Sequence, residues 1–163
     1  MPRVSFDALP PDARLWIFAS ERPLSSTERV RVLDEVDTFI EQWAAHDLPL
    51  TTARDLRYDQ FIFVAVDERS AGASGCSIDA LVRRMKALQT ELGIELVNQA
   101  PVLYRDGSAV ARVSRERFAA LVESGSVNQE TVVFDNTLTS VGAVRDGSWE
   151  LPAAGSWHSR AFF

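Results

Sequence analysis

The spacing of apolar positions divides the N-terminal part of the chain into short strands and two longer helices. Residues 14–20 (RLWIFAS) form an apolar and aromatic run, as expected of a buried strand. Ser25 and Glu28 then make an S-x-x-E capping box, and apolar residues recur at helical spacing after it. The pattern therefore predicts a strand at 14–20 and a helix over residues 26–46.

Polar and apolar residues mix over residues 50–58, residues 60–66 are strongly strand-forming, and the short gap between the two stretches predicts a tight hairpin. After a loop of small residues, amphipathic spacing predicts a second helix that ends at Gly93. A further strand at 102–104 would complete the order β-α-β-β-α-β, which is typical of ferredoxin-like folds. The expected class is α+β, with two helices on one face of an antiparallel sheet.

Turn and cap residues mark the elements of the C-terminal part. An Asp-Gly turn at Gly107 separates two short strands, and Ser114 is placed to cap a short helix. Strands are expected at 131–134 and 141–144, with a second Asp-Gly turn at Gly147. The sequence therefore predicts a β-α-β extension of the ferredoxin-like core.

The length and the last residues of the chain bear on its domain organisation. The chain has 163 residues, of which 46% are hydrophobic, and this suits a single compact domain over residues 1–163. Within it, residues 12–100 would form the core and residues 101–148 the extension. The tail, residues 149–163, is rich in aromatic side chains, and we expect it to dock on its own domain because exposure would leave a large apolar patch.

Charge and hydropathy exclude several classes of partner. The formal net charge is −6, so the chain has no basic footprint for nucleic acid or for anionic membranes. Apolar runs such as residues 61–66 are far shorter than the ~18 residues of a membrane span, and the first residues lack the apolar stretch of a signal peptide. A cytoplasmic protein without membrane insertion is expected, and its single cysteine forms no internal disulfide.

Three strings carry a resemblance that spans nearly the whole chain. They are RLWIFASERPLS near the start, FIFVAVDE followed by AGASGCSID in the middle, and SWHSRAFF at the end. This combination resembles a family of small, uncharacterised bacterial proteins that are often labelled ABC transporter ATPases. The family brings no established activity.

The ATPase label is tested by the motifs that nucleotide hydrolysis needs. Residues 61–68 look like a Walker B strand, and Ala73-Ser74-Gly75 is similar to the serine-glycine signature of ABC ATPases. Hydrolysis also needs a G-x-x-x-x-G-K-[ST] loop to hold the phosphates. Cys76 stands where its lysine would be, and the nearest downstream lysine, Lys86, occupies a helical position. ATPase activity is therefore not expected.

A second, partial resemblance covers residues 103–136. The string LYRDG, then Ser114 with Phe118 and Leu121, then SGSVNQETVVF, is similar to the strand-turn-strand-helix-strand pattern of GYF-type domains, which bind proline-rich peptides. The Gly-Pro-Phe or Gly-Tyr-Phe tripeptide that supplies their binding surface is missing here. The resemblance therefore implies the local fold of a GYF-type domain without its peptide-binding surface.

Cys76 is the main chemical candidate. It follows a glycine-containing loop at the start of the second predicted helix, where amide groups and the helix dipole favour a thiolate. His46 or His158 would supply the base that a cysteine nucleophile needs. The alternative interpretation is structural, because a single cysteine among small residues is usually a buried apolar group.

An anion-binding set is a further hypothesis. It combines the loop before the second helix with arginines at strand ends, namely Gly72, Ser74, Gly75, Ser77, Arg22 and Arg57. Arg14 and Arg54 are further members, although Arg54 and Arg57 lie on opposite strand faces. No spacing such as H-x3-H indicates a metal site, and no cofactor is expected.

Taken together, the sequence favours a non-catalytic binding or accessory domain for a protein partner or a small anionic ligand. The alternative is a thiol-dependent enzyme or redox protein that uses Cys76. Nucleic acid is not an expected partner. A homodimer is a further expectation, through an open sheet edge or the aromatic tail.

Overall fold

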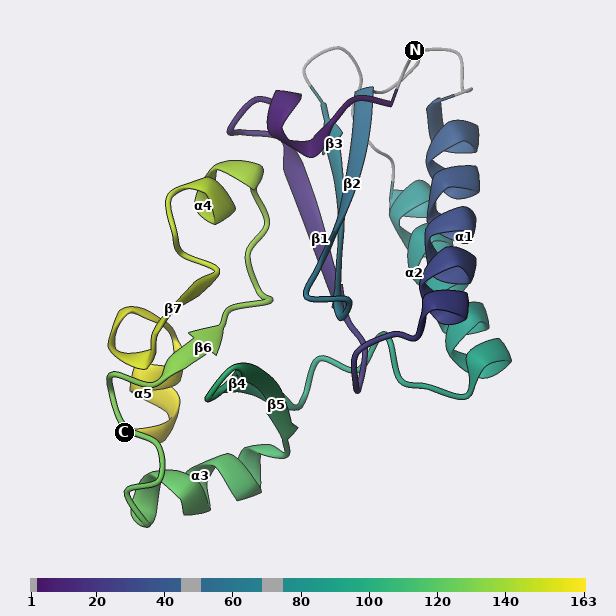
Figure 1. The fold of residues 1–163 in the computed structure, drawn as a ribbon. Helices are drawn as coiled ribbons and strands as arrows, with labels where there is room; N and C mark the ends of the chain where they lie inside the picture. The colour runs from purple at the N-terminus through teal and green to yellow at the C-terminus, as the bar shows by residue number, and fades with distance from the viewer. Residues whose placement is uncertain (1–2, 45–50, 69–74) are drawn as a thin grey trace. The chain divides into compact units, whose positions relative to one another are not determined.

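The computed structural model describes residues 3–44, 51–68 and 75–163 (Figure 1). It has the α+β class expected from the sequence. Contacts divide the chain into two units. The first unit comprises Met1–Val97 together with Thr139–Gly142, and the second comprises Asn98–Leu138 together with Ala143–Phe163.

The first unit contains an antiparallel sheet of three strands in the order β1-β3-β2. These strands are β1 (Arg14–Ala19), β2 (Thr51–Arg57) and β3 (Phe61–Asp67). Every residue of the central strand β3 is buried, which explains why its sequence is a continuous apolar run without alternation. Tyr58 and Asp59 turn the β2–β3 hairpin with positive φ angles of 56° and 53°, so the predicted tight hairpin is confirmed.

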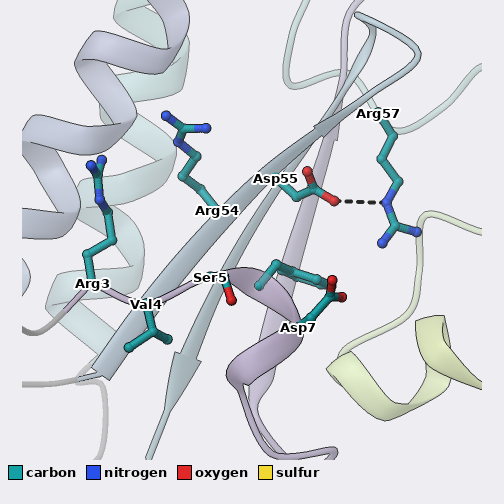
Figure 2. A pocket seen from close by; sticks show the side chains of 8 residues that line it. Arg3, Val4, Ser5, Asp7, Arg54, Asp55 and Arg57 are labelled. Atoms are coloured by element: carbon teal, nitrogen blue, oxygen red, sulfur yellow. Dashed lines mark hydrogen bonds and ion pairs between the residues drawn. The ribbon is translucent and has the colours of Figure 1, made fainter.

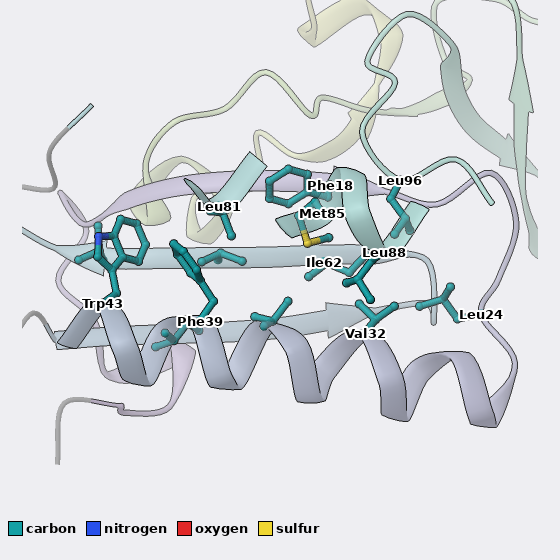
Figure 3. Packing of buried hydrophobic residues seen from close by; sticks show 14 of the residues in the cluster. Phe18, Leu24, Val32, Phe39, Trp43, Ile62, Leu81, Met85, Leu88 and Leu96 are labelled. Carbon is teal, nitrogen blue, oxygen red and sulfur yellow. The ribbon is translucent and has the colours of Figure 1, made fainter. Parts of the chain in front are cut away.

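Two helices cover one face of this sheet, α1 (Ser26–Ala44) and α2 (Gly75–Leu92). Figure 3 shows their apolar side chains directed toward the strands and toward each other. Val32, Ile40, Met85 and Ile62 are all fully buried in this cluster. On the opposite face, a short 3-10 helix, η1 (Phe6–Ala8), places Phe6 against Phe63 with ring centroids 5.8 Å apart. The sheet is therefore covered on both faces.

The second unit contains an antiparallel sheet of four strands in the order β5-β4-β6-β7. Its strands are β4 (Val102–Asp106), β5 (Ala109–Val113), β6 (Val132–Phe134) and β7 (Glu150–Pro152). The Gly107 turn between β4 and β5 has a positive φ of 62°, and Ser114 caps α3 (Arg115–Glu123) by accepting a hydrogen bond from the Arg117 amide. The predicted hairpin and capped helix are confirmed.

The aromatic residues of the tail pack within the second unit. The tail forms β7, the 3-10 helix η2 (Ala153–Gly155) and α5 (His158–Phe162). Trp149 is buried beside Phe134, with ring centroids 5.0 Å apart, and Phe162 lies 5.0 Å from the ring of Phe118. Phe118 is fully buried, and its ring also contacts that of Tyr104, with centroids 5.6 Å apart.

The expected strand at 141–144 is wrong, because this segment is a helix, α4 (Val141–Arg145). Its first two amides donate hydrogen bonds to the segment before β1, which belongs to the same unit. Val141 donates to the Ala13 carbonyl at 3.0 Å, and Gly142 donates to the Pro11 carbonyl at 2.7 Å. These bonds supply the partners that the first turn of a helix lacks. The residue before α4, Ser140, still makes a strand-like contact, since it forms an isolated antiparallel bridge with Arg14.

The strand predicted at 102–104 exists as β4, but it pairs in the second sheet. Its neighbours are β5 and β6, whereas the sequence pattern predicted that it would complete a ferredoxin-like core together with the strand at 14–20. Beside β1 the structure instead has Thr139, whose carbonyl accepts a hydrogen bond from the Leu15 amide at 2.9 Å.

Candidate functional site

A pocket of about 540 Å³ lies beside β2 in the first unit (Figure 2). Its lining comes from the segment before η1, from η1 itself and from the second half of β2, and consists of Arg3, Val4, Ser5, Phe6, Asp7, Arg54, Asp55 and Arg57. The volume falls within the ~300–1,000 Å³ range of ordinary ligand sites.

The pocket exists because the N-terminal segment follows β2 only briefly. The Val4 amide donates to the Thr52 carbonyl at 2.8 Å, and Arg3 and Thr52 form a parallel bridge. The chain then turns into η1, where the apolar side chain of Phe6 is buried against Phe63. This departure leaves a hollow along the later residues of β2.

Two arginines share one carboxylate on the side of β2 that faces α1. Arg54 Nε lies 2.8 Å from Asp37 Oδ1, and Arg3 Nη1 lies 2.7 Å from the same oxygen. Burial of Asp37 favours its neutral form, but Arg54 and Arg3 outweigh burial and hold the pKa of this carboxyl below its usual value. The hydrogen bonds that Arg54 donates to Asp37 in turn raise the pKa of Arg54. Asp37 and Arg54 are therefore both charged at neutral pH.

Arg57 lies on the opposite side of the same strand. Its guanidinium is 4.9 Å from the ring centroid of Phe63 and 5.6 Å from that of Phe6, distances typical of cation–π contacts. Arg57 Nε also lies 3.0 Å from Asp55 Oδ2, as the dashed line in Figure 2 marks. These contacts hold the Arg57 guanidinium within the lining of the pocket.

The lining thus offers groups for binding, with both signs of charge. Three arginines stand against two aspartates, and hydroxyl and phenyl groups complete the surface. Because the arginines already have carboxylate partners, a small anion would have to compete with Asp37 and Asp55. The arrangement suits a larger ligand with both charges better than it suits a lone anion.

The strand register separates Arg57, one of the predicted anion-binding arginines, from the start of α2. Arg57 pairs with Phe61 at the hairpin end of the sheet, whereas α2 begins after the other end of β3. Arg22 forms a two-pronged ion pair with Glu28, at 2.8 and 2.9 Å. Arg22 and the Ser25 amide together lower the pKa of Glu28 to about 2. Arg22 is therefore accounted for by its ion pair with Glu28, the glutamate of the capping box.

The loop members of the predicted site are described only in part. Gly72, Ser74 and His46 lie outside the described residues. Gly75, Cys76 and Ser77 form the first turn of α2, as the sequence predicted for Cys76, but the side chains of Cys76 and Ser77 are not among those that the structure describes. The pairing of Cys76 with His46 or His158 stays a prediction.

His158 lies within the aromatic cluster of the second unit. It is 1% exposed, stacks on Trp157 at 4.0 Å, and Ser156 Oγ hydrogen-bonds its Nδ1. Burial lowers the pKa of His158 to about 4; Asp135 opposes this shift and Arg115 adds to it. The imidazole is therefore neutral at physiological pH, and its contacts suit a structural role.

A second hollow, of about 770 Å³, surrounds Arg14 in the first unit. It is lined by Pro11, Asp12, Arg14, Glu68, Thr139 and Ser140. Arg14 lies 3.4 Å from Glu68 and its guanidinium is 5.1 Å from the ring of Trp16. Ion pairing and ring contact account for this arginine.

The N-terminal contribution to the pocket was missed from the sequence. Arg3, Ser5 and Asp7 precede the first predicted strand and show no periodic pattern. Asp55 carried a usable signal, because alternating charges in the stretch RDLR are typical of an edge strand that is protected from pairing. The contact between the two segments is long-range, and spacing along the chain does not encode it.

Within residues 3–44, 51–68 and 75–163, no group of three or more histidine, cysteine or acidic side chains is placed to hold a metal ion. No helix in these ranges has the length and apolar character needed to cross a membrane. Comparisons with protein-family models, with curated proteins and with solved structures gave no match to this chain.

Proposed function

We propose that the protein is a non-catalytic binding module, and that the pocket beside β2 receives a segment of a protein partner. The observation that supports this most is the lining of the pocket. It places Arg54 on one side of a single strand and Arg57 on the other, with carboxylates beside both. Such a surface suits an extended chain with several polar groups, since one small ion would contact only one side.

The proposal is tested by selecting random linear peptides, displayed on phage, against the immobilised full-length protein. Enriched peptides are then measured for binding to the Arg57→Ala variant, which removes one charged wall of the pocket. We expect at least about tenfold weaker binding, because hydrogen bonds to a charged group contribute about 1.5–3 kcal/mol.

Arg29→Ala is the matched control. Arg29 pairs with Asp59 at 2.8 Å and is not part of the pocket lining, so the variant loses the same charge elsewhere on the first unit. Peptide binding should be unchanged. No enrichment, or equal binding to both variants, would contradict the proposal. So would thermal stabilisation by a small dicarboxylate without any peptide enrichment.

The finer features of the fold belong to the same proposal. The order β1-α1-β2-β3-α2 supports a ferredoxin-like first unit, although β4 pairs elsewhere. The order β4-β5-α3-β6 supports a GYF-like segment in the second unit. The relationship to the small bacterial family is likewise proposed on the sequence resemblance alone, and the homodimer on the open edge of β2.

The thiol-dependent alternative has a direct test. If Cys76 were an activated nucleophile, iodoacetamide would alkylate it rapidly below the ~8.5 reference pKa of a free thiol. The proposed binding function predicts slow labelling of the folded protein at pH 7. The measurement is the alkylation rate from pH 5 to 9, followed by mass spectrometry, with the urea-unfolded chain as the control. Fast labelling of the folded protein at pH 6 would favour the alternative.

A further inference from the structure

The N-terminal segment supplies most of the lining of the pocket beside β2. Five of the eight described lining residues belong to this segment, namely Arg3, Val4, Ser5, Phe6 and Asp7. The other three lie on β2, which pairs with β3 along its whole length. We call residues 3–7 the strap. The pocket is therefore complete only while the strap lies on the sheet.

The two ends of the strap are held by contacts of different kinds. At its C-terminal end, Phe6 is 6% exposed and its ring lies 5.8 Å from that of Phe63. At its N-terminal end, the Val4 amide donates to the Thr52 carbonyl at 2.8 Å, and the Arg3 side chain, which is 40% exposed, forms an ion pair. Chain termini with few buried apolar groups open at a low cost in free energy. We therefore expect the strap to open from its N-terminal end, while Phe6 stays in place.

Asp37 of α1 joins the N-terminal end of the strap to β2. Its Oδ1 lies 2.7 Å from Arg3 Nη1 and 2.8 Å from Arg54 Nε, and its Oδ2 lies 3.1 Å from Arg54 Nη2. Figure 2 shows the side chains of Arg3 and Arg54 extending in the same direction from the strap and from β2. Asp37 itself is not part of the pocket lining. Hydrogen bonds between guanidinium and carboxylate groups are about twice as strong as neutral ones, so this carboxylate holds the strap from outside the pocket.

A ligand that fills the pocket meets the strap on one wall and β2 on the other. Such a ligand binds fully only when the strap is docked, so its binding shifts the strap toward the docked state. The docked strap in turn raises the affinity for the ligand by the same factor, because the coupling between two binding events is reciprocal. The strap and the ligand are therefore expected to stabilise each other.

We propose that residues 3–7 act as a strap that closes the pocket, that Asp37 holds the strap closed, and that a bound segment of the partner protein stabilises the closed state. This inference rests on the proposed function and specifies how the same site is regulated. It gives Asp37 a role in binding through the strap, without contact between Asp37 and the ligand. The strap is the element with two states, docked and open, and both Asp37 and the ligand favour the docked state.

The first experiment measures opening of the strap in the absence of any ligand. The docked strap protects the Val4 amide through its hydrogen bond to Thr52. The rate of exchange of this amide with solvent, followed by NMR on the full-length protein, therefore reports the open fraction. Asp37→Asn removes the charge that Arg3 meets. We expect the Val4 amide to exchange at least about fivefold faster in this variant, because hydrogen bonds to charged groups are stronger than neutral ones.

Asp34→Asn is the matched control. Asp34 is an exposed residue of the same helix, so this variant loses the same charge without removing the contact with the strap. Its Val4 amide should exchange at the wild-type rate. Asp37→Glu keeps the carboxylate, and its rate should lie closer to the wild-type value than to that of Asp37→Asn. The Leu24 amide, which donates to the Asp59 carbonyl at 2.7 Å, should not change in any variant.

The second experiment tests the coupling between strap and ligand. The probe is the tightest-binding phage-selected peptide whose binding depends on Arg57, and it is added to the wild-type protein at about ten times its Kd. A ligand that binds only the docked state slows exchange of the Val4 amide by a factor of 1 + [L]/Kd, so we expect exchange about tenfold slower. The Leu24 amide again serves as the internal control.

The outcomes separate the inference from the function on which it rests. Equal exchange of the Val4 amide in Asp37→Asn and Asp34→Asn overturns the role of Asp37. A peptide that binds but leaves the exchange of Val4 unchanged overturns the coupling, and the binding function then stands without a closing strap. If no peptide is selected, the function and the coupling are both overturned, and the Val4 exchange rates alone decide whether Asp37 holds the strap.

Discussion

Gly142 has no side chain at a point where the chain of the first unit leaves no space for one. A Cβ atom there would lie 2.7 Å from the Pro11 carbonyl oxygen and 2.9 Å from the Pro11 Cβ. The same carbonyl accepts the Gly142 amide, so the two segments cannot separate without losing a hydrogen bond. This close approach explains why a short apolar stretch holds a glycine.

Gly142→Ala should therefore lower the free energy of unfolding by about 1–3 kcal/mol, the usual cost of forcing extra atoms into a packed site. Urea denaturation measures the change. Gly155→Ala is the control, because its added Cβ would meet only the flexible end of Leu151, at 3.3 Å. A Gly142→Ala variant as stable as Gly155→Ala would show that the Pro11 segment moves aside at little cost.

His158 makes the stability of the second unit depend on pH. Its pKa is about 4 in the folded protein, against an ordinary value of 6.5, because burial disfavours the charged ring. The unfolded chain therefore binds more protons between these values, and stability rises with pH across this window. Its contribution is complete above about pH 6.5 and is lost as pH falls toward 4.

The expected outcome is a fall in melting temperature from pH 7 to pH 4 that is shallower in His158→Gln than in the wild-type protein. Circular dichroism melting at half-unit steps measures both slopes. Comparison of the two proteins cancels the contribution of the carboxylates that they share. Parallel curves would contradict the assignment of the low pKa to His158.

Prediction from sequence had clear physical limits at the residue scale. The capping pair Ser25 and Glu28 was predictable because its geometry is local: Glu28 donates its amide to Ser25 Oγ at 3.2 Å, and its carboxylate accepts the Ser25 amide at 2.9 Å. The lining of the pocket was not, because Arg3 and Asp37 meet only after α1 has packed on the sheet. Arg57 was singled out for ligand binding, but its contacts with Phe6 and Phe63 have no local signature.

At the scale of elements, the cap of α1 can be tested by one substitution. Ser25→Ala removes the acceptor for the Glu28 amide, and such changes cost about 0.5–2 kcal/mol. We expect a loss of about 1 kcal/mol in urea denaturation. Ser26→Ala is the control: it alters a neighbouring exposed serine inside the helix, and alanine is a good helix former. A loss of equal size in both variants would argue against the cap.

Elements with a long, regular pattern were predicted well. The helices at 26–44 and 75–92 follow from apolar spacing over several turns, and β3 follows from its continuous apolar run. The stretch at 141–144 was misassigned because a few apolar residues do not distinguish a strand from one helical turn. Its hydrogen bonds to Pro11 and Ala13 decide the outcome, and those partners lie far away in the sequence.

At the scale of the whole molecule, the C-terminal aromatic residues are expected to hold the second unit together. Phe118 is fully buried, and its ring contacts include His158 at 6.2 Å, Phe162 at 5.0 Å and Phe163 at 6.5 Å. Burial of one large apolar side chain contributes about 1.5–3 kcal/mol. Several such side chains approach the whole stability of a domain, about 5–15 kcal/mol.

Deletion of residues 157–163 should therefore unfold most of the second unit. Hydrogen exchange followed by mass spectrometry is the measurement, and amides of β4, β5 and β6 should lose protection while those of β3 keep it. Phe163→Ala is the control, since this side chain is 40% exposed, and its effect should be small. Full protection of β4 after the deletion would show that the tail is dispensable.

Sheet partnership was the least predictable property of the whole molecule. The turn at Gly107 and the cap at Ser114 are local signals and were predicted. Whether β4 joins the first or the second sheet depends on contacts such as the pairing of Tyr104 with Val133. These contacts join segments that are distant in sequence, and one sequence contains no direct record of them.

The placement of Thr139–Gly142 in the first unit has a consequence for the order in which the protein is made. Residues Met1–Val97 emerge from the ribosome well before Thr139. β1 is therefore exposed long before Thr139, which accepts the Leu15 amide, and before Val141 and Gly142, which donate to the carbonyls of Ala13 and Pro11. The first unit therefore cannot reach its complete form during synthesis until much of the second unit has emerged. Any fragment that ends at Val97 carries the same unfinished edge permanently.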